Sequence, residues 1–184
     1  MTAPPRRHKT AAEHARPTPE QALAGPRAPL VLVLENIRSG GNVGSVLRTA
    51  DGFALEAVLL AGYTPAPPHR EILKTSLGAE ASVPWRRVGD LAAELSRFRE
   101  NGYRVAALEQ TPDAQMLGAL SVQPSDRWVV VLGNEVRGVT PETLALVDEV
   151  IEIPQAGAKQ SLNVSVAAGV LAWELVGRRG RVAS

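Results

Sequence analysis

The chain has 184 residues, a hydrophobic fraction of 45% and a formal net charge of +1, which suits a single domain with a sizeable core. It has no cysteine, which excludes disulfides and thiol catalysis, and its three histidines form no zinc-ligand pattern, so we expect no metal site. No apolar run reaches the roughly 18 residues of a membrane-spanning helix. No apolar stretch follows the basic N-terminus either, so we expect no secretory signal and a cytoplasmic protein.

The charge is distributed unevenly along the chain. Residues 1–29 hold five basic against two acidic residues, and three arginines between positions 178 and 181 make a second basic end. With +3 at each end and +1 overall, residues 30–177 carry −5. Basic ends suit a polyanionic partner, whose binding would weaken with salt. Solvated tails that aid solubility would give the same pattern, and charge alone leaves both possibilities open.

The first 29 residues are rich in proline, alanine and arginine and show little apolar periodicity. This composition predicts a basic tail that is mostly disordered. We therefore expect the folded domain to span residues 30–184.

Within that domain, short apolar runs alternate with segments of helical spacing. Runs that are apolar throughout, such as 30–34, are typical of strands covered on both faces of a sheet. Strands are expected at 30–34, 57–61, 103–108, 128–132 and 149–153, with a short extended piece at 83–85. Helices are expected at 43–53, 71–75, 91–98, 141–146 and 161–176. The core candidates of the last helix are Leu162, Val166, Val170 and Leu175. The alternation predicts an α/β fold with a mostly parallel sheet flanked by helices.

Three polar, glycine-containing loops follow predicted strands, and in a parallel sheet such loops meet at the carboxyl edge. The first, 35–50, leads into a helix but has neither the G-x-x-x-x-G-K-[ST] nor the G-x-G-x-x-G phosphate-binding pattern. Its Asn42 and Arg48 can both border a pocket. Alternatively, Asn42 only caps the helix and Arg48 is an exposed surface residue.

The second loop, 132–139, places Glu135 directly after an apolar strand. The carboxylate there can orient a ligand or pair with Arg48 or Arg137. A plain turn that uses the backbone freedom of its glycines also explains this sequence.

The third loop leads from Ile153 into the last predicted helix. Ser161 suits a helix cap, Asn163 can donate and accept hydrogen bonds within a pocket, and Leu162 can offer backbone groups. Capping alone is the alternative explanation for the two polar residues. Taken together, the three loops favour a ligand site.

The same loops match three motifs of a known family. Residues 42–50 read N-x-G-x-x-x-R-T-A, residues 132–138 read L-G-N-E-x-x-G, and residues 153–165 read I-P-x-x-G-x-x-x-S-L-N-V-S. Over roughly residues 30–177 the chain therefore resembles the SpoU/TrmH class of RNA 2′-O-methyltransferases in the SPOUT superfamily. One small departure is Gln155, where many members carry Met.

The resemblance implies a C-terminal deep trefoil knot, a homodimer with sites at the subunit interface, and S-adenosylmethionine as the cofactor, with no metal. The backbone implied to meet the cofactor is that of Leu108, Gly133, Ile153 and Leu162. The implied catalytic residues are Arg48, proposed as the base, and four residues that organise the site around it, namely Asn42, Glu135, Ser161 and Asn163.

An arginine base needs a physical explanation, because a guanidinium is normally fully protonated. A substrate phosphate can reorganise Arg48 at the moment of attack. Otherwise Arg48 only positions the phosphate and stabilises charge. The sequence leaves both roles open.

The implied reaction is methyl transfer to a ribose 2′-hydroxyl of tRNA or rRNA. Residues 74–80, followed by 83–85, look like the branch that acts on tRNA guanosine. The alternative is a non-catalytic RNA-binding or assembly module that keeps the fold, although the intact motif residues argue against it. An enzyme that uses another nucleotide is disfavoured by the missing phosphate-binding patterns.

Overall fold

The computed structural model describes residues 7–10, 16–159 and 161–177, and among them it forms a seven-stranded sheet with the order β3-β2-β1-β6-β4-β7-β5. Neighbouring strands all pair in parallel. The strands are β1 Ala28–Glu35, β2 Leu55–Ala61, β3 Trp85–Val88, β4 Tyr103–Leu108, β5 Gln115–Met116, β6 Arg127–Leu132 and β7 Glu149–Glu152. The α-helices are α1 Pro19–Ala24, α2 Gly40–Gly52, α3 Arg70–Ser76, α4 Leu91–Glu100, α5 Pro141–Leu144 and α6 Val164–Ala172. The expected α/β class with a mostly parallel sheet is confirmed.

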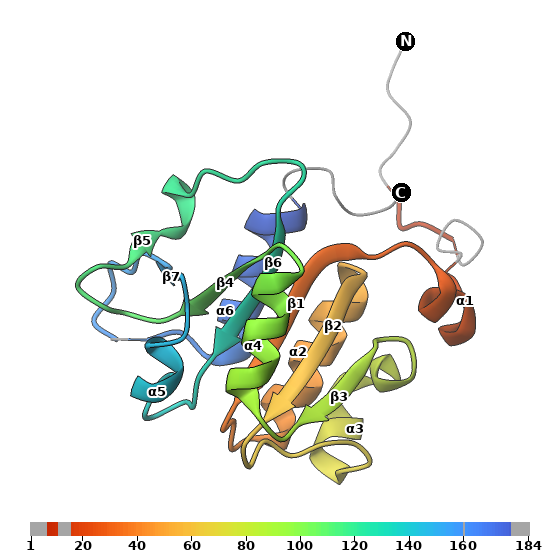
Figure 1. Ribbon diagram of the computed structural model, residues 1–184. Helices are drawn as coiled ribbons and strands as arrows, with labels where there is room; N and C mark the ends of the chain where they lie inside the picture. The colour runs from red at the N-terminus through yellow and green to blue at the C-terminus, as the bar shows by residue number, and fades with distance from the viewer. Residues whose placement is uncertain (1–6, 11–15, 160, 178–184) are drawn as a thin grey trace.

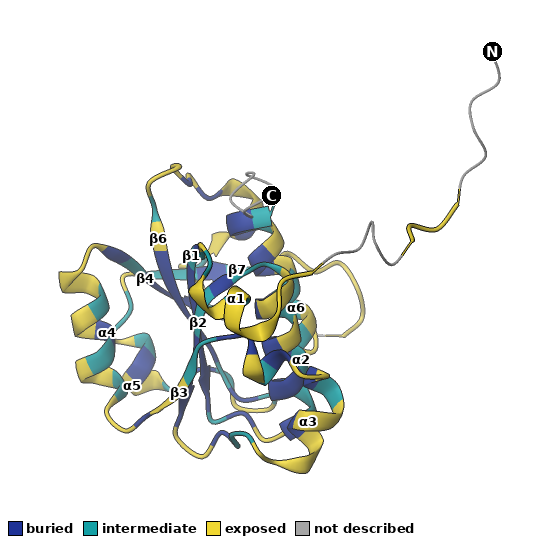
Figure 2. Ribbon diagram, turned by 90° about the vertical axis from the view of Figure 1, so that its right-hand side faces the viewer, coloured by how far each residue is buried: buried dark blue, intermediate teal, exposed yellow. Residues whose placement is uncertain are grey.

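Helices cover both faces of the sheet. Helices α4 and α5 lie on one face, and α2, α3 and α6 lie on the other (Figures 1 and 2). Alternate residues of β1 serve the two cores: Leu32 packs with the α2 and α6 side, and Val33 with the α4 side. Burial on both faces explains why β1 and β6 are apolar at nearly every position.

The carboxyl ends of the central strands meet at one edge of the sheet. Leu34 of β1 pairs with Leu132 of β6, which pairs with Leu108 of β4, and Leu108 pairs with Ile151 of β7. The loops that follow these four strands therefore begin side by side, at the lower edge in Figure 1. This register brings together the three motif loops predicted to converge.

Most predicted elements are present, with small shifts at their ends. The strand predicted at 103–108 has those bounds, and the helix predicted at 71–75 extends by one residue at each end. The extended piece predicted at 83–85 becomes strand only from Trp85 on. The helix predicted from residue 43 begins earlier, at Gly40, because the Ser39 side chain accepts a hydrogen bond from the Asn42 backbone N–H.

The last helix differs most from its prediction. It begins at Val164 rather than at residue 161, because Asn163 is its cap and keeps a non-helical backbone (ψ 136°). Its α-helical part ends at Ala172 and continues as a π-helical turn over Trp173–Gly177. Of the four core candidates only Leu175 is buried; the other three, Leu162, Val166 and Val170, are 40%, 51% and 39% exposed.

The N-terminal segment contains a helix that was not predicted. Residues 19–24 form α1, which Thr18 and Gln21 cap reciprocally, so the expectation of disorder is wrong for this stretch. Arg27 fastens the segment to the domain by donating to the carbonyls of Leu55 and Ser82. The basic C-terminal residues 178–181 and the N-terminal residues 1–6 and 11–15 lie outside the described part of the chain. In that part no helix is long and apolar enough to cross a membrane.

Candidate functional site

The first feature of the site is a carboxylate at the start of α2. Glu135, from the loop after β6, accepts hydrogen bonds from the backbone N–H groups of Arg38 (3.1 Å) and Ser39 (3.2 Å). It also accepts one from Nδ2 of Asn42, at 2.8 Å. Unpaired N–H groups at a helix start favour an anion in this position. The loop after β6 is thereby tied to the loop after β1.

The pKa of Glu135 reflects these contacts. Burial alone would raise it, but hydrogen bonds from the backbone of Arg38, from its own backbone, from Asn42 and from the backbone of Ser39 outweigh that effect, and the pKa lies below its ordinary value of 4.5. The side chain is therefore an anion at neutral pH. The alternative pairing of Glu135 with Arg48 or Arg137 is not formed among the described residues.

The third motif loop joins through Asn163. Its Oδ1 accepts from the backbone N–H and the hydroxyl of Ser165, at 2.9 and 2.6 Å, and so caps α6. Its Nδ2 donates to Oδ1 of Asn42 at 3.1 Å. Asn163 thus caps the helix and also bonds to the first motif loop, whereas Ser161 does not cap the helix. A continuous polar chain, Glu135–Asn42–Asn163, links the three loops.

A cavity of about 490 Å³ lies beside this polar chain. All four residues predicted to contact the cofactor line it, as do Glu135 and Ser161. The wall also includes Gln155 and the apolar side chains of Leu144, Ile151 and Val164. The predicted residues that line it are Leu108, Gly133, Glu135, Ile153, Ser161 and Leu162.

The turn after β6 has no room for larger residues. A Cβ on Gly133 would lie 2.1 Å from backbone atoms of Gly138 and Val139, and Gly138 itself has a φ of 70°. Within the turn, Oδ1 of Asn134 accepts from the backbone N–H groups of Val136 (2.9 Å) and Arg137 (3.0 Å). The conformational explanation for the two glycines therefore also holds, and the turn forms one wall of the cavity.

Two further carboxylates fix this turn, and neither was predicted from the sequence. Glu35, only 5% exposed, accepts from the backbone N–H and the hydroxyl of Thr140, both at 2.9 Å. Glu109 accepts from the backbone N–H of Val139 at 2.9 Å and lines the cavity. Like Glu135, which lies three residues after β6, both lie at or just beyond the carboxyl end of an apolar strand: Glu35 is the last residue of β1, and Glu109 follows β4. That position was therefore a usable signal for all three.

Arg48 lies apart from the other predicted site residues. It is exposed on α2 and does not line the cavity. Among the described residues it makes no hydrogen bond or ion pair. Within a single chain the structure therefore brings together eight of the nine predicted site residues and leaves this cation free.

The lining of the cavity suits a small organic ligand. No group of three or more His, Cys, Asp or Glu side chains in the described part of the chain could hold a metal. The cavity combines apolar side chains, loop backbone and three acidic residues, Glu109, Glu135 and Glu152. Its volume falls within the range of about 300–1,000 Å³ that is usual for small-molecule sites.

Comparisons with known proteins agree with the motifs. The SpoU rRNA Methylase family matches residues 29–173. An uncharacterized tRNA/rRNA methyltransferase of Mycolicibacterium paratuberculosis is 36% identical over 159 residues, which cover 86% of this chain and 50% of the relative. The 23S rRNA (guanosine-2′-O-)-methyltransferase RlmB of Vibrio vulnificus is 34% identical, over 87% of this chain and 64% of the relative.

A solved structure is similar as well. The AdoMet-bound rRNA methyltransferase from Sinorhizobium meliloti superimposes with a TM-score of 0.75 at 26% identity, and the match covers 86% of this chain and 59% of that one. This chain thus spans half to two thirds of the length of these relatives.

Proposed function

The chain belongs to the SpoU rRNA methylase family, and on that premise we propose that it transfers a methyl group from S-adenosylmethionine to a ribose 2′-hydroxyl of tRNA or rRNA. Guanosine is the favoured nucleoside, in line with the name of the Vibrio vulnificus relative. The proposed catalytic domain is residues 30–184. A substrate of this kind makes the cytoplasm the proposed location.

One observation carries the proposal. Side chains from three loops, Glu135, Asn42 and Asn163, form a continuous hydrogen-bonded chain at the edge of the cavity. Only Asn163 of the three caps a helix, so helix capping does not explain why these side chains bond to one another across the sheet edge. A fixed polar group beside a small-molecule cavity is what positioning a ribose next to a cofactor requires.

The cavity fits the proposed cofactor in size and chemistry. Apolar side chains of Leu144, Ile151 and Val164 offer a surface on which an adenine ring can pack. The residues proposed to hold the cofactor through their backbone are Leu108, Gly133, Ile153 and Leu162. S-adenosylmethionine, when bound, supplies a methyl group on a positively charged sulfur.

The remaining residues act on the ribose and its phosphate. The ionised Glu135 fixes Asn42, which in turn fixes Asn163, so these dipoles are oriented before substrate binds. The Ser161 hydroxyl lines the cavity and can contact the ribose. Arg48 makes no ion pair within the described residues. Because a guanidinium stays protonated, we favour a role in holding the substrate phosphate and stabilising charge over a role as base.

A homodimer is also part of the proposal. An exposed apolar stripe runs along α6 and the residues at its two ends. It consists of Leu162, Val166, Val170 and Trp173, and the Trp173 residue is 56% exposed. A stripe of this kind marks an interaction surface, and it begins at Leu162, which lines the cavity. A second copy of the chain packed there would lie next to the site. Sedimentation equilibrium tests this, and a monomer at micromolar concentration would contradict it.

We also propose the trefoil knot of the family. The loops after β4, β6 and β7 and the start of α6 all converge on one cavity, as a knotted cofactor site requires. An experimental structure that traces residues 153–163 past the loop after β4 would decide the point.

Two measurements test the proposed activity. The first is a calorimetric titration with S-adenosylmethionine. The second is transfer of tritium-labelled methyl groups to total tRNA and rRNA, followed by mapping of 2′-O-methyl positions in RNA from cells with and without the protein. We expect saturable cofactor binding and the loss of specific ribose methylations. Binding of RNA without binding of S-adenosylmethionine would instead favour a non-catalytic RNA-binding module.

A further inference from the structure

A tyrosine at the carboxyl edge combines exposure with fixed geometry. Tyr63, which follows β2, is 59% exposed. Its hydroxyl nevertheless accepts a hydrogen bond from Nδ2 of Asn134 at 2.9 Å, and its backbone N–H donates to Oδ1 of Asn36 at 3.3 Å. The ring is therefore held at its tip and at its backbone while much of its surface faces solvent.

The chain around Tyr63 is held firmly as well. The next residue, Thr64, is fully buried; its hydroxyl donates to the carbonyl of Leu34 at 2.8 Å and accepts from the backbone N–H of Ile37 at 3.0 Å. The preceding Gly62 has a φ of 62°, and a Cβ there would lie 2.0 Å from the Asn36 amide oxygen. An ordinary exposed tyrosine on a loop would not need such support, so the fixed ring calls for a function.

The ring is coupled to the candidate active site. Asn134, which holds its hydroxyl, also bonds the carbonyl of Asn36 at 2.8 Å and shapes the turn that carries Glu135. Only one peptide bond separates Asn134 from Glu135. The ring and the carboxylate therefore share one rigid support.

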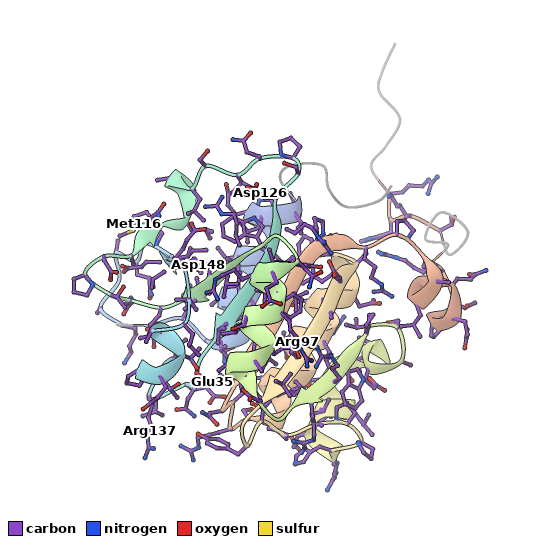
Figure 3. All side chains as sticks on the ribbon, viewed as in Figure 1. Glu35, Arg97, Met116, Asp126, Arg137 and Asp148 are labelled. Atoms are coloured by element: carbon purple, nitrogen blue, oxygen red, sulfur yellow. The ribbon has the colours of Figure 1, made fainter. Side chains whose placement is uncertain are left out.

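Two arginines lie near the residues that hold the ring, beside the carboxylate of Glu135. Arg38 lies next to Glu135 because its backbone N–H donates to the Glu135 carboxylate, and Arg137 follows Glu135 by two residues in the chain. Both arginines are exposed. Neither makes an ion pair in the described part of the chain. Figure 3 shows the Arg137 side chain pointing away from the body at the edge where Glu35 ends β1. An exposed aromatic ring beside free cations is the usual pattern of a surface that binds unpaired RNA.

We propose that the ring of Tyr63 is a stacking platform for an unpaired base of the substrate RNA, next to the ribose that is methylated. This proposal rests on the proposed function and specifies how the RNA is held. Stacking is tolerant of base identity, because every base has a π-face. Because the ring is already fixed, little conformational entropy is lost when a base stacks on it.

The test compares Tyr63→Phe and Tyr63→Ala in the full chain. The probe is a short single-stranded RNA with one 2-aminopurine, whose fluorescence is quenched on stacking. We expect Tyr63→Ala to weaken RNA binding about 5- to 150-fold and to abolish the quenching. Tyr63→Phe keeps the ring and should retain both. Met116→Ala, on an exposed side chain far from this edge in Figure 3, is the matched control and should change neither.

The outcomes separate this proposal from the proposed function. Failure of the unaltered protein to bind S-adenosylmethionine would overturn the function, and the quenching would still report on Tyr63. Unchanged RNA affinity and quenching in Tyr63→Ala would overturn the platform. Loss of self-association in that variant, with RNA binding intact, would also overturn it by assigning the ring to a subunit interface. Thermal unfolding followed by circular dichroism establishes that each variant is folded, whether or not the cofactor binds.

Discussion

Charged side chains have different partners at the two edges of the sheet. At the amino edge, the Arg104 guanidinium bonds Asp126 at 3.1 Å and Glu149 at 2.6 Å and lies 4.0 Å over the Trp128 ring. At the carboxyl edge, Glu135 is held by N–H groups alone. Figure 3 shows Asp126 and Glu35 at these opposite ends.

This difference teaches how a binding edge can be recognised. Around Arg104 the charges are paired. The pKa of Arg104 is raised, and the largest cause is its hydrogen bond to Glu149. Such a network stabilises the fold and leaves nothing for a ligand. Where dipoles hold the anion, the exposed Arg38 and Arg137 make no ion pair in the described part of the chain and can meet a polyanion.

The largest expected effect comes from removing the cation of Arg48. Arg48→Ala should lower methyl transfer at least about 100-fold, the scale reported for loss of one charge-stabilising donor. Binding of S-adenosylmethionine should be unchanged, because Arg48 does not line the cavity. The measurement is methyl transfer under saturating cofactor and RNA. Arg97→Ala, whose side chain is 74% exposed on α4, is the control. Retained transfer in the Arg48 variant would remove that residue from the mechanism.

The second-largest effect is expected from a substitution in the wall of the cavity. Gly133→Ala places a Cβ 2.1 Å from backbone atoms, so the turn must move. We expect loss of cofactor affinity and a decrease of about 1–3 kcal/mol in the free energy of unfolding, as for other overpacked sites. Calorimetry and thermal unfolding measure the two effects. Gly89→Ala, where nothing lies within 4 Å, is the matched control; normal affinity in the Gly133 variant would contradict the cavity assignment.

The amino edge should respond in stability alone. Arg104→Ala leaves Glu149 and Asp126 without their cation, and we expect a loss of about 1–3 kcal/mol in the free energy of unfolding. Methyl transfer per folded molecule should stay the same. Equilibrium urea unfolding, with long incubation, measures the first quantity. If cofactor affinity fell as well, the contrast between the two edges would be wrong.

The smallest expected effect concerns pH. The pKa of Glu135 is lowered from its ordinary value of 4.5 in the folded chain, so its charge adds stability above that pH. The contribution disappears as the pH falls through the lowered folded-state pKa. Since the group is partly solvated, we expect about 1 kcal/mol or less. Glu135→Gln should therefore be less stable than the unaltered protein at neutral pH and equal to it in acid; a gap that persists in acid would exclude the charge as its cause.

The strands were predictable because their cause is local. A run such as 30–34 is apolar at every position only if both faces are covered, and β1 is buried on both. The motif loops were predictable for a related reason, since each follows such a strand. Their convergence needed only the rule that parallel strands end at one edge.

The start and the buried face of α6 were not predictable. Both Asn163 and Ser161 are residue types that can cap a helix. What distinguishes Asn163 is its hydrogen bond to Asn42, which lies 121 residues away in the sequence. Helix α6 is apolar on nearly every side, so its sequence gives no preferred face. Packing against α2 decided that Val166 points outward.

By itself the sequence determined the α/β class, the strands and the three loops that carry the site, because hydrophobic pattern and turn chemistry act over a few residues. Only the tertiary structure decided which polar atoms meet. Glu135 and Asn42 are 93 residues apart, and their 2.8 Å hydrogen bond exists because β1 and β6 are neighbours in register. The isolation of Arg48 and the fixed ring of Tyr63 follow from the same long-range packing, which no local pattern records.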